Sequence, residues 1–326
     1  MTTLEPRDGD VAGYRSALPQ LGGDLFLTDG GVETTLIFHD GLALPDFAAY
    51  ALLGRSEGEA ALRKYFRGYA GIARRFGVGL ILESATWRAS RDWAQRLGHT
   101  PARLAELNRA AIRQLEEMRA EYQAPETPTV ISGCVGPRGD GYNPTRLMSV
   151  EEAESYHTEQ VRTFADTAAD LVTAITMNYV EEAIGITRAA RRWGMPAVIA
   201  FTVETDGRLP TGDSLQAAIE RVDTETGAYP AYYMVNCAHP THFERVLDGR
   251  QPWAQRVRGL RANASRQSHA ELNEATTLDI GDPVELGREY AELKRRLPRL
   301  NVMGGCCGTD HRHVEQIATA CVPLFR

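Results

Sequence analysis

The stretch Met303-Gly304-Gly305-Cys306-Cys307-Gly308-Thr309 lies near the C-terminus of this 326-residue chain and follows a short apolar run, Leu300-Asn301-Val302-Met303. A helical pattern, from His313 to Cys321, comes next. Neighbouring thiols do not easily close a relaxed disulfide with each other, whereas both can bind one soft metal ion, for which Zn²⁺ is the natural choice. The dipeptide alone is equally consistent with a glycine-rich turn that holds two buried structural cysteines.

Seven further apolar runs precede this stretch, and each of them is short and nearly continuous. They are Leu25–Thr28, Val78–Leu82, Thr129–Gly133, Leu171–Met177, Ala197–Val203, Ala231–Val235 and the more weakly apolar Gly259–Ala264. Runs of this kind are typical of parallel strands that are buried on both faces.

Segments with helical periodicity separate these runs. They are Ala60–Phe76, Pro101–Tyr122, Val150–Ala169, Glu181–Trp193, Ser214–Thr226, Thr241–Leu247, Pro283–Leu297 and His311–Cys321. Ser149 and Asp213 carry the cap signals of the helices that follow them. Strand and helix alternate eight times, which predicts an α/β fold, a single (β/α)8 TIM barrel. A doubly wound open sheet is the alternative, but no GxGxxG motif follows any run.

We assign residues 24–326 to this barrel and residues 1–23 to a polar N-terminal leader. The leader has neither the basic nor the apolar region of a signal peptide, and no run reaches the roughly 18 apolar residues of a membrane span. The net charge of −7 argues against nucleic acid and against an anionic membrane as partners. Five cysteines, an odd number, indicate a reducing compartment and hence a cytoplasmic protein. The sequence is compatible with a homo-oligomer.

Unusual side chains stand at the C-terminal ends of the predicted strands, where a barrel builds its active site. Among them, Cys237 follows the sixth strand and the Cys306-Cys307 pair follows the eighth. One Zn²⁺ could therefore bind all three thiolates and keep an open fourth position, which is the mark of a catalytic site. Three anionic sulfurs make zinc a poor activator of water but suit a substrate thiol, which becomes a nucleophile toward an activated methyl group.

The chain resembles the homocysteine S-methyltransferase family over roughly residues 24–322. The motifs that carry the resemblance are Asp29-Gly30-Gly31 with Thr34, Gly136-Pro137, Asn236-Cys237 and Gly304-Gly305-Cys306-Cys307-Gly308-Thr309. The resemblance implies a barrel whose catalytic zinc is held by Cys237, Cys306 and Cys307. It further implies that the zinc-bound thiolate of homocysteine accepts the methyl group to give methionine.

We expect the donor to be a small onium compound such as S-methylmethionine, S-adenosylmethionine or a betaine. A single barrel takes up the whole chain and leaves no segment for a cobalamin or folate module, so we expect direct transfer. Aromatic faces and carboxylates favour such a cation. Trp87 is the best aromatic candidate, and the alternative is that it only caps the barrel core. Glu83 and Glu204 either face the pocket or pair with arginines at its rim.

Two positions depart from the family pattern. The usual Glu-Thr pair after the fourth strand is Ile175-Thr176, and Glu33 stands where glycine is usual. We hypothesise that Asp29, with Glu33 or Glu83, binds the amino group of homocysteine. The alternatives are a different thiol acceptor or onium substrate, and a non-enzymatic barrel that responds to zinc or oxidation. The predicted substrate-binding residues are Asp29, Gly30, Glu33, Glu83, Thr86, Trp87 and Asn236, the last also as support for the neighbouring cysteine.

Overall fold

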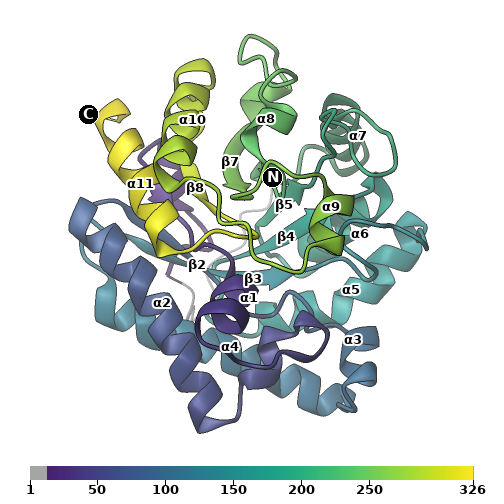
Figure 1. The fold of residues 1–326 in the computed structure, drawn as a ribbon. Coiled ribbons are helices and arrows are strands. Elements are labelled where there is room, and N and C mark those ends of the chain that lie inside the picture. Colours follow the sequence, from purple (N-terminus) through teal and green to yellow (C-terminus); the bar gives the residue numbers. More distant parts are fainter. Residues whose placement is uncertain (1–12, 326) are drawn as a thin grey trace.

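Eight parallel strands close into a barrel in the computed structural model, which describes residues 13–325. Each strand pairs with the next one along the chain, and β8 pairs with β1. Figure 1 shows the helices arranged around these strands. The predicted (β/α)8 barrel is confirmed.

The strands fall where the apolar runs predict them. They are β1 Phe26–Leu27, β2 Gly79–Glu83, β3 Thr129–Val135, β4 Leu171–Met177, β5 Ala197–Phe201, β6 Tyr232–Asn236, β7 Val257–Ala262 and β8 Val302–Gly305. Three of them end on polar or glycine residues that the runs left out, because barrel pairing continues to the rim. Glu83, Asn236 and Gly305 are thus the last residues of β2, β6 and β8.

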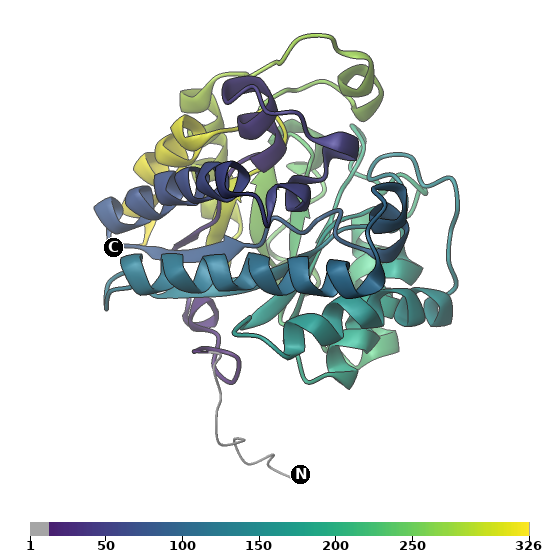
Figure 2. The same ribbon diagram turned by 90° about the horizontal axis from the view of Figure 1, so that it is seen from below.

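The longer helices also lie close to their predicted positions. The helices are α1 Val32–Thr34, α2 Ser56–Phe76, α3 Arg91–Arg96, α4 Pro101–Tyr122, α5 Val150–Ala165, α6 Val180–Arg192, α7 Leu215–Thr226, α8 Pro240–Phe243, α9 His269–Glu274, α10 Pro283–Arg296 and α11 His311–Cys321. Figure 2, a view turned by 90°, shows α2 and α4 crossing one side of the barrel side by side. Short 3-10 or π turns add to the loops.

One predicted cap is confirmed and one is wrong. Ser149 and Glu152 form the expected capping box at the start of α5. At α7 the cap is Ser214, whose Oγ accepts a hydrogen bond from the backbone N–H of Ala217. Asp213 does not cap this helix, because its carboxylate accepts a hydrogen bond from Thr211 Oγ1 and its carbonyl group accepts one from the N–H of Leu209, both within the preceding loop.

Apolar side chains fill the barrel near the N-terminal ends of its strands. They include Phe26, Val130, Leu171, Val198, Tyr232 and Val302, each at or next to the first residue of its strand. Alternate residues of the same strands, such as Leu27 and Val172, pack outward beneath the helices. The lower part of the barrel is therefore solid, and side chains at the upper ends are left to form a site.

The residues just before β1 cover this lower end. Leu18 joins the interior cluster, and the N–H of Tyr14 donates to Asp170 over 2.8 Å. Arg15 donates to the carbonyl groups of Ala165 and Ala169. These contacts come from the second part of the predicted leader, residues 13–23. Residues 1–12 lie outside the described part of the chain. The boundary predicted between leader and barrel therefore stays a prediction.

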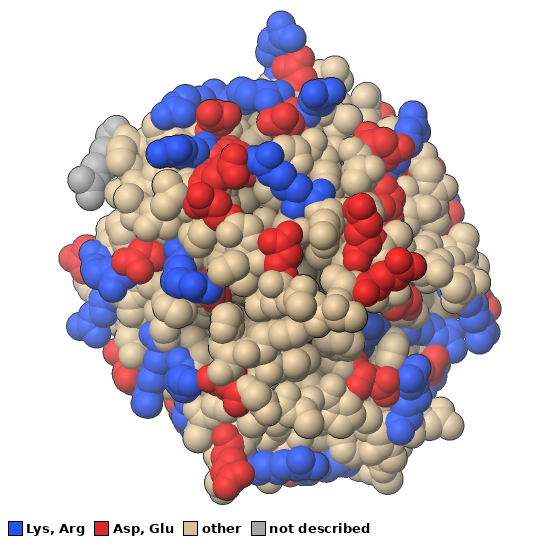
Figure 3. All heavy atoms as spheres, viewed as in Figure 1, with Lys and Arg blue, Asp and Glu red and all other residues tan. Residues whose placement is uncertain are grey.

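Figure 3 shows acidic and basic side chains interspersed over the face that Figure 1 presents. Lysine and arginine do not gather into one broad patch on this face. Among the described helices, none combines the length and apolarity that crossing a membrane requires.

Candidate active site

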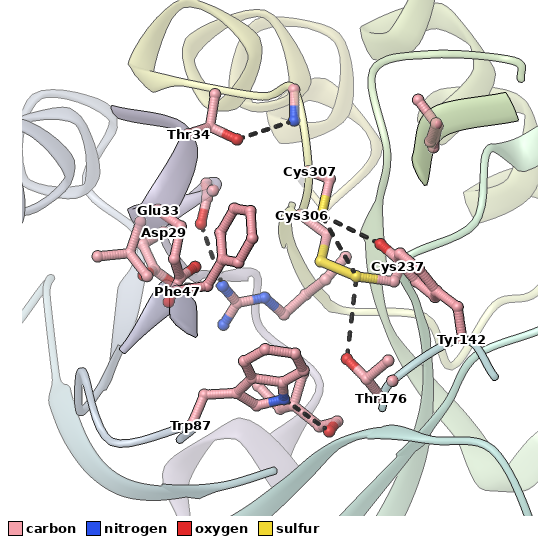
Figure 4. A pocket seen from close by; sticks show the side chains of 18 of the residues that line it. Asp29, Glu33, Thr34, Phe47, Trp87, Tyr142, Thr176, Cys237, Cys306 and Cys307 are labelled. Carbon is pink, nitrogen blue, oxygen red and sulfur yellow. Dashed lines mark hydrogen bonds and ion pairs between the residues drawn. A yellow bond between two sulfur atoms is a disulfide. The ribbon is translucent and has the colours of Figure 1, made fainter. Parts of the chain in front are cut away.

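The three cysteines predicted as zinc ligands meet at the upper ends of β6 and β8. All three sulfurs lie within 4.8 Å of one another. Cys237 and Cys306 are joined by a disulfide, and Cys307 Sγ lies 3.8 Å from Cys237 Sγ (Figure 4). The structure thus brings together residues that are about 70 positions apart in the sequence.

The sulfur positions fit a zinc ion once the disulfide is reduced. Zn–S bonds are about 2.3 Å long, so a tetrahedral ion separates its sulfurs by about 3.8 Å. The distance from Cys237 to Cys307 matches this value. Because thiolates bind zinc and disulfide sulfurs carry no such charge, the bonded pair describes an oxidised form of the site.

An unusual backbone conformation turns Cys237 toward the cavity. Val235 packs in the outer layer, so regular strand alternation would direct Cys237 outward as well. Cys237 instead adopts a left-handed φ of 53°, and Thr176, at the end of β4, has a φ of 66°. Such conformations cost roughly 1–3 kcal/mol each and persist where the surroundings hold them, commonly at functional sites.

Asn236 links these two strained residues. Its Oδ1 accepts from the N–H of Thr176 over 3.0 Å, and its Nδ2 donates to Thr176 Oγ1 over 2.9 Å. Nδ2 also lies 3.9 Å from Cys306 Sγ. Asn236 is fully buried and is absent from the cavity wall, so its contacts support the cysteines.

The Asp29-Gly30-Gly31 motif contacts the motif of the vicinal cysteines directly, which explains why a glycine is required at position 31. A Cβ atom at Gly31 would lie 2.7 Å from the carbonyl oxygen of Cys306. The same oxygen accepts from Thr309 Oγ1 over 2.7 Å, and Thr34 Oγ1 accepts from the N–H of Gly308. The loop after β1 thereby fixes the turn that carries the vicinal cysteines.

Tyr142 and His269 cover the other side of the sulfurs. The hydroxyl group of Tyr142 lies 3.2 Å from Cys307 Sγ, and its ring stacks on His269 with 4.0 Å between centroids. His269 Nε2 lies 2.6 Å from the carbonyl oxygen of Cys237, and Nδ1 lies 3.0 Å from Glu204 Oε1. Neither ring was identified from the sequence, because Tyr142 lies in an irregular loop after β3 and His269 begins the short helix α9, which has no predicted counterpart. Glu204 therefore pairs with a histidine, not with an arginine.

A cavity of about 380 Å³ opens beside the cysteines. Of the predicted substrate-binding residues, five line it: Asp29, Gly30, Glu33, Glu83 and Trp87. Thr86 does not line it; this residue is fully buried, and its hydroxyl group donates to the carbonyl oxygen of Cys134 over 2.8 Å.

Asp29 has partners for both carboxylate oxygens. Oδ2 accepts from the hydroxyl group of Tyr65 over 2.8 Å, and Oδ1 lies 2.6 Å from Nη2 of Arg261. Burial lowers the pKa of Arg261, but the negative charges of Asp29 and Glu83 raise it by more. The pKa of Arg261 therefore lies above its ordinary value. Arg261 was missed at the sequence level, although a charge between Leu260 and Ala262 in an apolar strand is a usable signal.

Two further carboxylates lie in the cavity wall. Burial raises the pKa of Glu83 to about 7, against the opposing charge of Arg261. Burial likewise raises the pKa of Glu33 to about 7, partly opposed by a backbone hydrogen bond. Oε2 of Glu83 is buried without a hydrogen-bond partner.

Aromatic rings complete the cavity. Trp87 donates its indole N–H to the carbonyl oxygen of Ile175 over 3.2 Å, and the guanidinium carbon of Arg88 lies 4.2 Å from its ring centroid. Phe47, which the sequence did not suggest, lines the cavity while 55% exposed. Figure 4 shows both rings across the cavity from Tyr142.

Comparisons with known proteins agree with this geometry. A family model described as homocysteine S-methyltransferase matches residues 26–321. The chain is also similar in fold to the homocysteine methyltransferase MmuM from Escherichia coli. With its oxidised form the TM-score is 0.73 at 18% identity, over 92% of this chain and 99% of that chain. With its metallated form the TM-score is 0.71 at 17% identity, over 91% of this chain and 96% of that chain.

The matched segment begins in β1 and ends in α11, so it contains the whole barrel and every cysteine of the candidate metal site. The prediction of a methyltransferase enzyme is thereby confirmed. The chain belongs to the homocysteine S-methyltransferase family.

Proposed function

We propose that this protein is a zinc-dependent S-methyltransferase that moves a methyl group from a small onium donor to the thiol of homocysteine, giving methionine. The observation that carries the proposal is the group of three cysteine sulfurs within 4.8 Å of one another at the edge of a cavity. Zinc bound by three thiolates keeps a fourth position, which suits an acceptor sulfur. Retained thiols require a reducing environment, which is consistent with a cytoplasmic protein.

Cys237, Cys306 and Cys307 would hold the metal. Bound there, zinc lowers the pKa of an acceptor thiol and fixes the position of its sulfur. Asn236, Tyr142 and the carbonyl contacts of His269 and Thr309 hold the ligands in place. The cavity beside the sulfurs leaves room for both substrates.

The transfer is a single displacement at carbon. The acceptor thiol loses its proton to solvent, and its sulfur then forms a bond to the methyl carbon of the donor. The bond from that carbon to the onium sulfur or nitrogen breaks, and its electron pair stays with the heteroatom. A sulfonium donor therefore leaves as a neutral thioether and an ammonium donor as a tertiary amine.

The donor cation would lie against aromatic rings. Phe47 and Trp87 line the cavity, and a cation over such a ring gains about 0.5–2 kcal/mol. Arg88 already stacks on Trp87, so Phe47 is the freer of the two rings. Glu33 adds negative charge to the same wall when it is ionised.

We propose Glu83 and Glu33 as the carboxylates that bind the amino group of homocysteine in place of the residue lost at Ile175. Asp29 is less available because both its oxygens are engaged. The test is the Michaelis constant for homocysteine in Glu33→Gln and Glu83→Gln. A rise in either variant supports the assignment, and unchanged values in both contradict it.

The experiment that tests the proposed function combines metal analysis with a donor panel. We expect one zinc per reduced chain, and methionine from homocysteine with at least one of S-methylmethionine, S-adenosylmethionine or betaine. Cys306→Ala should lose the zinc and the activity, whereas Cys321→Ala, in the core away from the site, should keep both. A reduced wild-type chain that binds no zinc would contradict the proposal.

A different thiol acceptor is the second candidate function. Ile175 supplies no carboxylate at the end of β4, and Arg261 neutralises Asp29. Zinc in the protein with no methionine from any donor would favour this candidate, and a panel of other thiols would then identify the acceptor.

A further inference from the structure

Arg261 is a charged side chain inside the barrel, in the cavity wall. Leu260 and Ala262 belong to the outer layer, so strand alternation directs Arg261 inward. The residue is 6% exposed and lines the cavity. A guanidinium group in such a place requires partners, because a buried charge without hydrogen bonds is costly.

The contacts of Arg261 leave one nitrogen free. Nη2 pairs with Asp29 and also donates to the carbonyl oxygen of Gly30 over 3.3 Å, while Nε donates to the carbonyl oxygen of Gly305 over 3.2 Å. Nη1 is buried and has no hydrogen-bond partner among the described residues. An unpartnered donor of this kind, on a cavity wall, indicates a ligand acceptor group.

Arg261 stands between the strands that supply the cysteines. Its carbonyl oxygen accepts from the N–H of Cys237 over 3.0 Å, and the N–H of Cys306 donates to the carbonyl oxygen of Ala262 over 2.8 Å. Neighbouring strands lie about 4.8 Å apart, so the Arg261 side chain starts within one strand spacing of both ligands. A short molecule whose sulfur is at the cysteines can therefore reach the guanidinium group.

We infer that Arg261 Nη1 binds the carboxylate of the acceptor, so that this enzyme selects thiols that carry a carboxylate. This inference rests on the proposed function for the identity of the site. A carboxylate is the complementary anion because guanidinium groups bind it through strong charge-assisted hydrogen bonds. The Asp29 pair holds the guanidinium group in position.

Homocysteine and two analogues, each of which lacks one of its two charged groups, test the inference without any mutation. Homocysteine carries both groups, 4-mercaptobutanoate lacks the amino group, and 3-aminopropanethiol lacks the carboxylate. Binding to the reduced, zinc-loaded full chain is measured by calorimetry with no donor present. We expect 4-mercaptobutanoate within about fivefold of homocysteine, and 3-aminopropanethiol at least about 30-fold weaker, as the loss of a charge-assisted hydrogen bond predicts.

Variants then assign the preference to Arg261. Arg261→Lys keeps a charge for Asp29, and the double variant Asp29→Asn with Arg261→Gln removes both buried charges together. We expect the preference for the carboxylate to fall about tenfold or more in each. Arg119→Lys is the matched control, because Arg119 forms another buried pair, with Asp170 over 2.7 Å, at the opposite end of the barrel.

The outcomes separate this inference from the proposed function. Equal or tighter binding of 3-aminopropanethiol overturns the inference, whether or not methyl transfer occurs, and so does a carboxylate preference that survives in the double variant. The expected binding pattern supports the inference even if no donor gives a methylated product, and in that case the proposed function alone fails. No binding of any of the three thiols overturns both.

Discussion

The hydroxyl group of Tyr142 lies 3.2 Å from the sulfur of Cys307 and connects the loop after β3 to the end of β8. Replacing Tyr142 with Phe removes this contact while keeping the stacked ring. We expect zinc affinity to fall about tenfold, in the range found when a group that orients a metal ligand is lost. Competition with a chromophoric chelator measures the change. Tyr229→Phe, whose hydroxyl group donates to Met195 far from the site, should bind zinc as the wild type does.

The disulfide between Cys237 and Cys306 predicts different numbers of free thiols in the oxidised and the reduced protein. Of the five cysteines, Cys134, Cys307 and Cys321 are free, so the oxidised chain should show three thiols after denaturation and the reduced chain five. Reduction should restore zinc binding because it returns two thiolates to the site. Five thiols in both preparations would show that the pair does not form in solution.

Gly31 should tolerate no side chain. Gly31→Ala places a Cβ atom 2.7 Å from the carbonyl oxygen of Cys306, so the turn that carries the vicinal cysteines must shift. We expect a loss of about 1–3 kcal/mol in the free energy of unfolding, together with weaker zinc binding. The control is Gly68→Ala in α2, where nothing lies within 4 Å of the added atom, and stability should rise by up to about 1 kcal/mol. Denaturant unfolding of the zinc-free reduced chains measures both.

Glu83 should make stability depend on pH. Its folded pKa of about 7 exceeds the ordinary 4.5, so the folded chain binds this proton more tightly than the unfolded chain. The resulting contribution to stability is complete below about pH 4.5 and is lost as the pH rises through about 7. The charged groups that act on it are Arg261 of β7 and Asp29 after β1, with hydrogen bonds from Ser132 and Thr173.

Glu83→Gln keeps an uncharged side chain of similar shape at every pH. Relative to wild type, the variant should gain roughly 3 kcal/mol in the free energy of unfolding between pH 4 and pH 8, because it has no proton to lose in this range. Unfolding in urea across this range measures the difference. Glu117→Gln, an exposed residue paired with Arg63, should stay within about 0.5 kcal/mol of wild type throughout. A flat difference for Glu83→Gln would contradict the prediction.

Phe47 should affect the donor and not the acceptor. Phe47→Leu keeps apolar volume but removes the aromatic face, so we expect the Michaelis constant of the donor to rise about five- to tenfold. The Michaelis constant of the acceptor thiol should not change. Phe47→Tyr restores an aromatic face and should behave as the wild type. If Phe47→Leu and Phe47→Tyr change the Michaelis constant of the donor equally, the aromatic face does not contribute to donor binding and the prediction is wrong.

The sequence was sufficient to predict the barrel and the three cysteines that the structure brings together. Strands buried on both faces leave apolar runs such as Leu171–Met177, and the order of the chain then determines which strand ends meet. The inward direction of Glu83 could also be predicted, because Glu83 continues the inward alternation of Ile81 on β2.

Other parts of the site depend on distances that no local pattern encodes. Cys237 faces the cavity only because its φ is positive, against the alternation of β6. Tyr142 reaches Cys307 from a loop whose path has no periodic signal. The Asp29–Arg261 pair joins β7 to the loop after β1, on the two sides of β8, so only the closed fold shows that Asp29 is neutralised.

The packed lower half of the barrel determines the order in which substrates enter the cavity and products leave it. Phe26, Val130, Tyr232 and their neighbours block the passage below the cavity, and Leu18 joins them from the N-terminal side. Among the described residues, a molecule seated beside Arg261 therefore leaves by the route through which it entered, past Phe47. With the acceptor beside Arg261 and the donor against Phe47, as we propose, the acceptor arrives before the donor, and the spent donor departs before the methylated product. Steady-state kinetics should accordingly show compulsory-order addition, with excess donor slowing product escape.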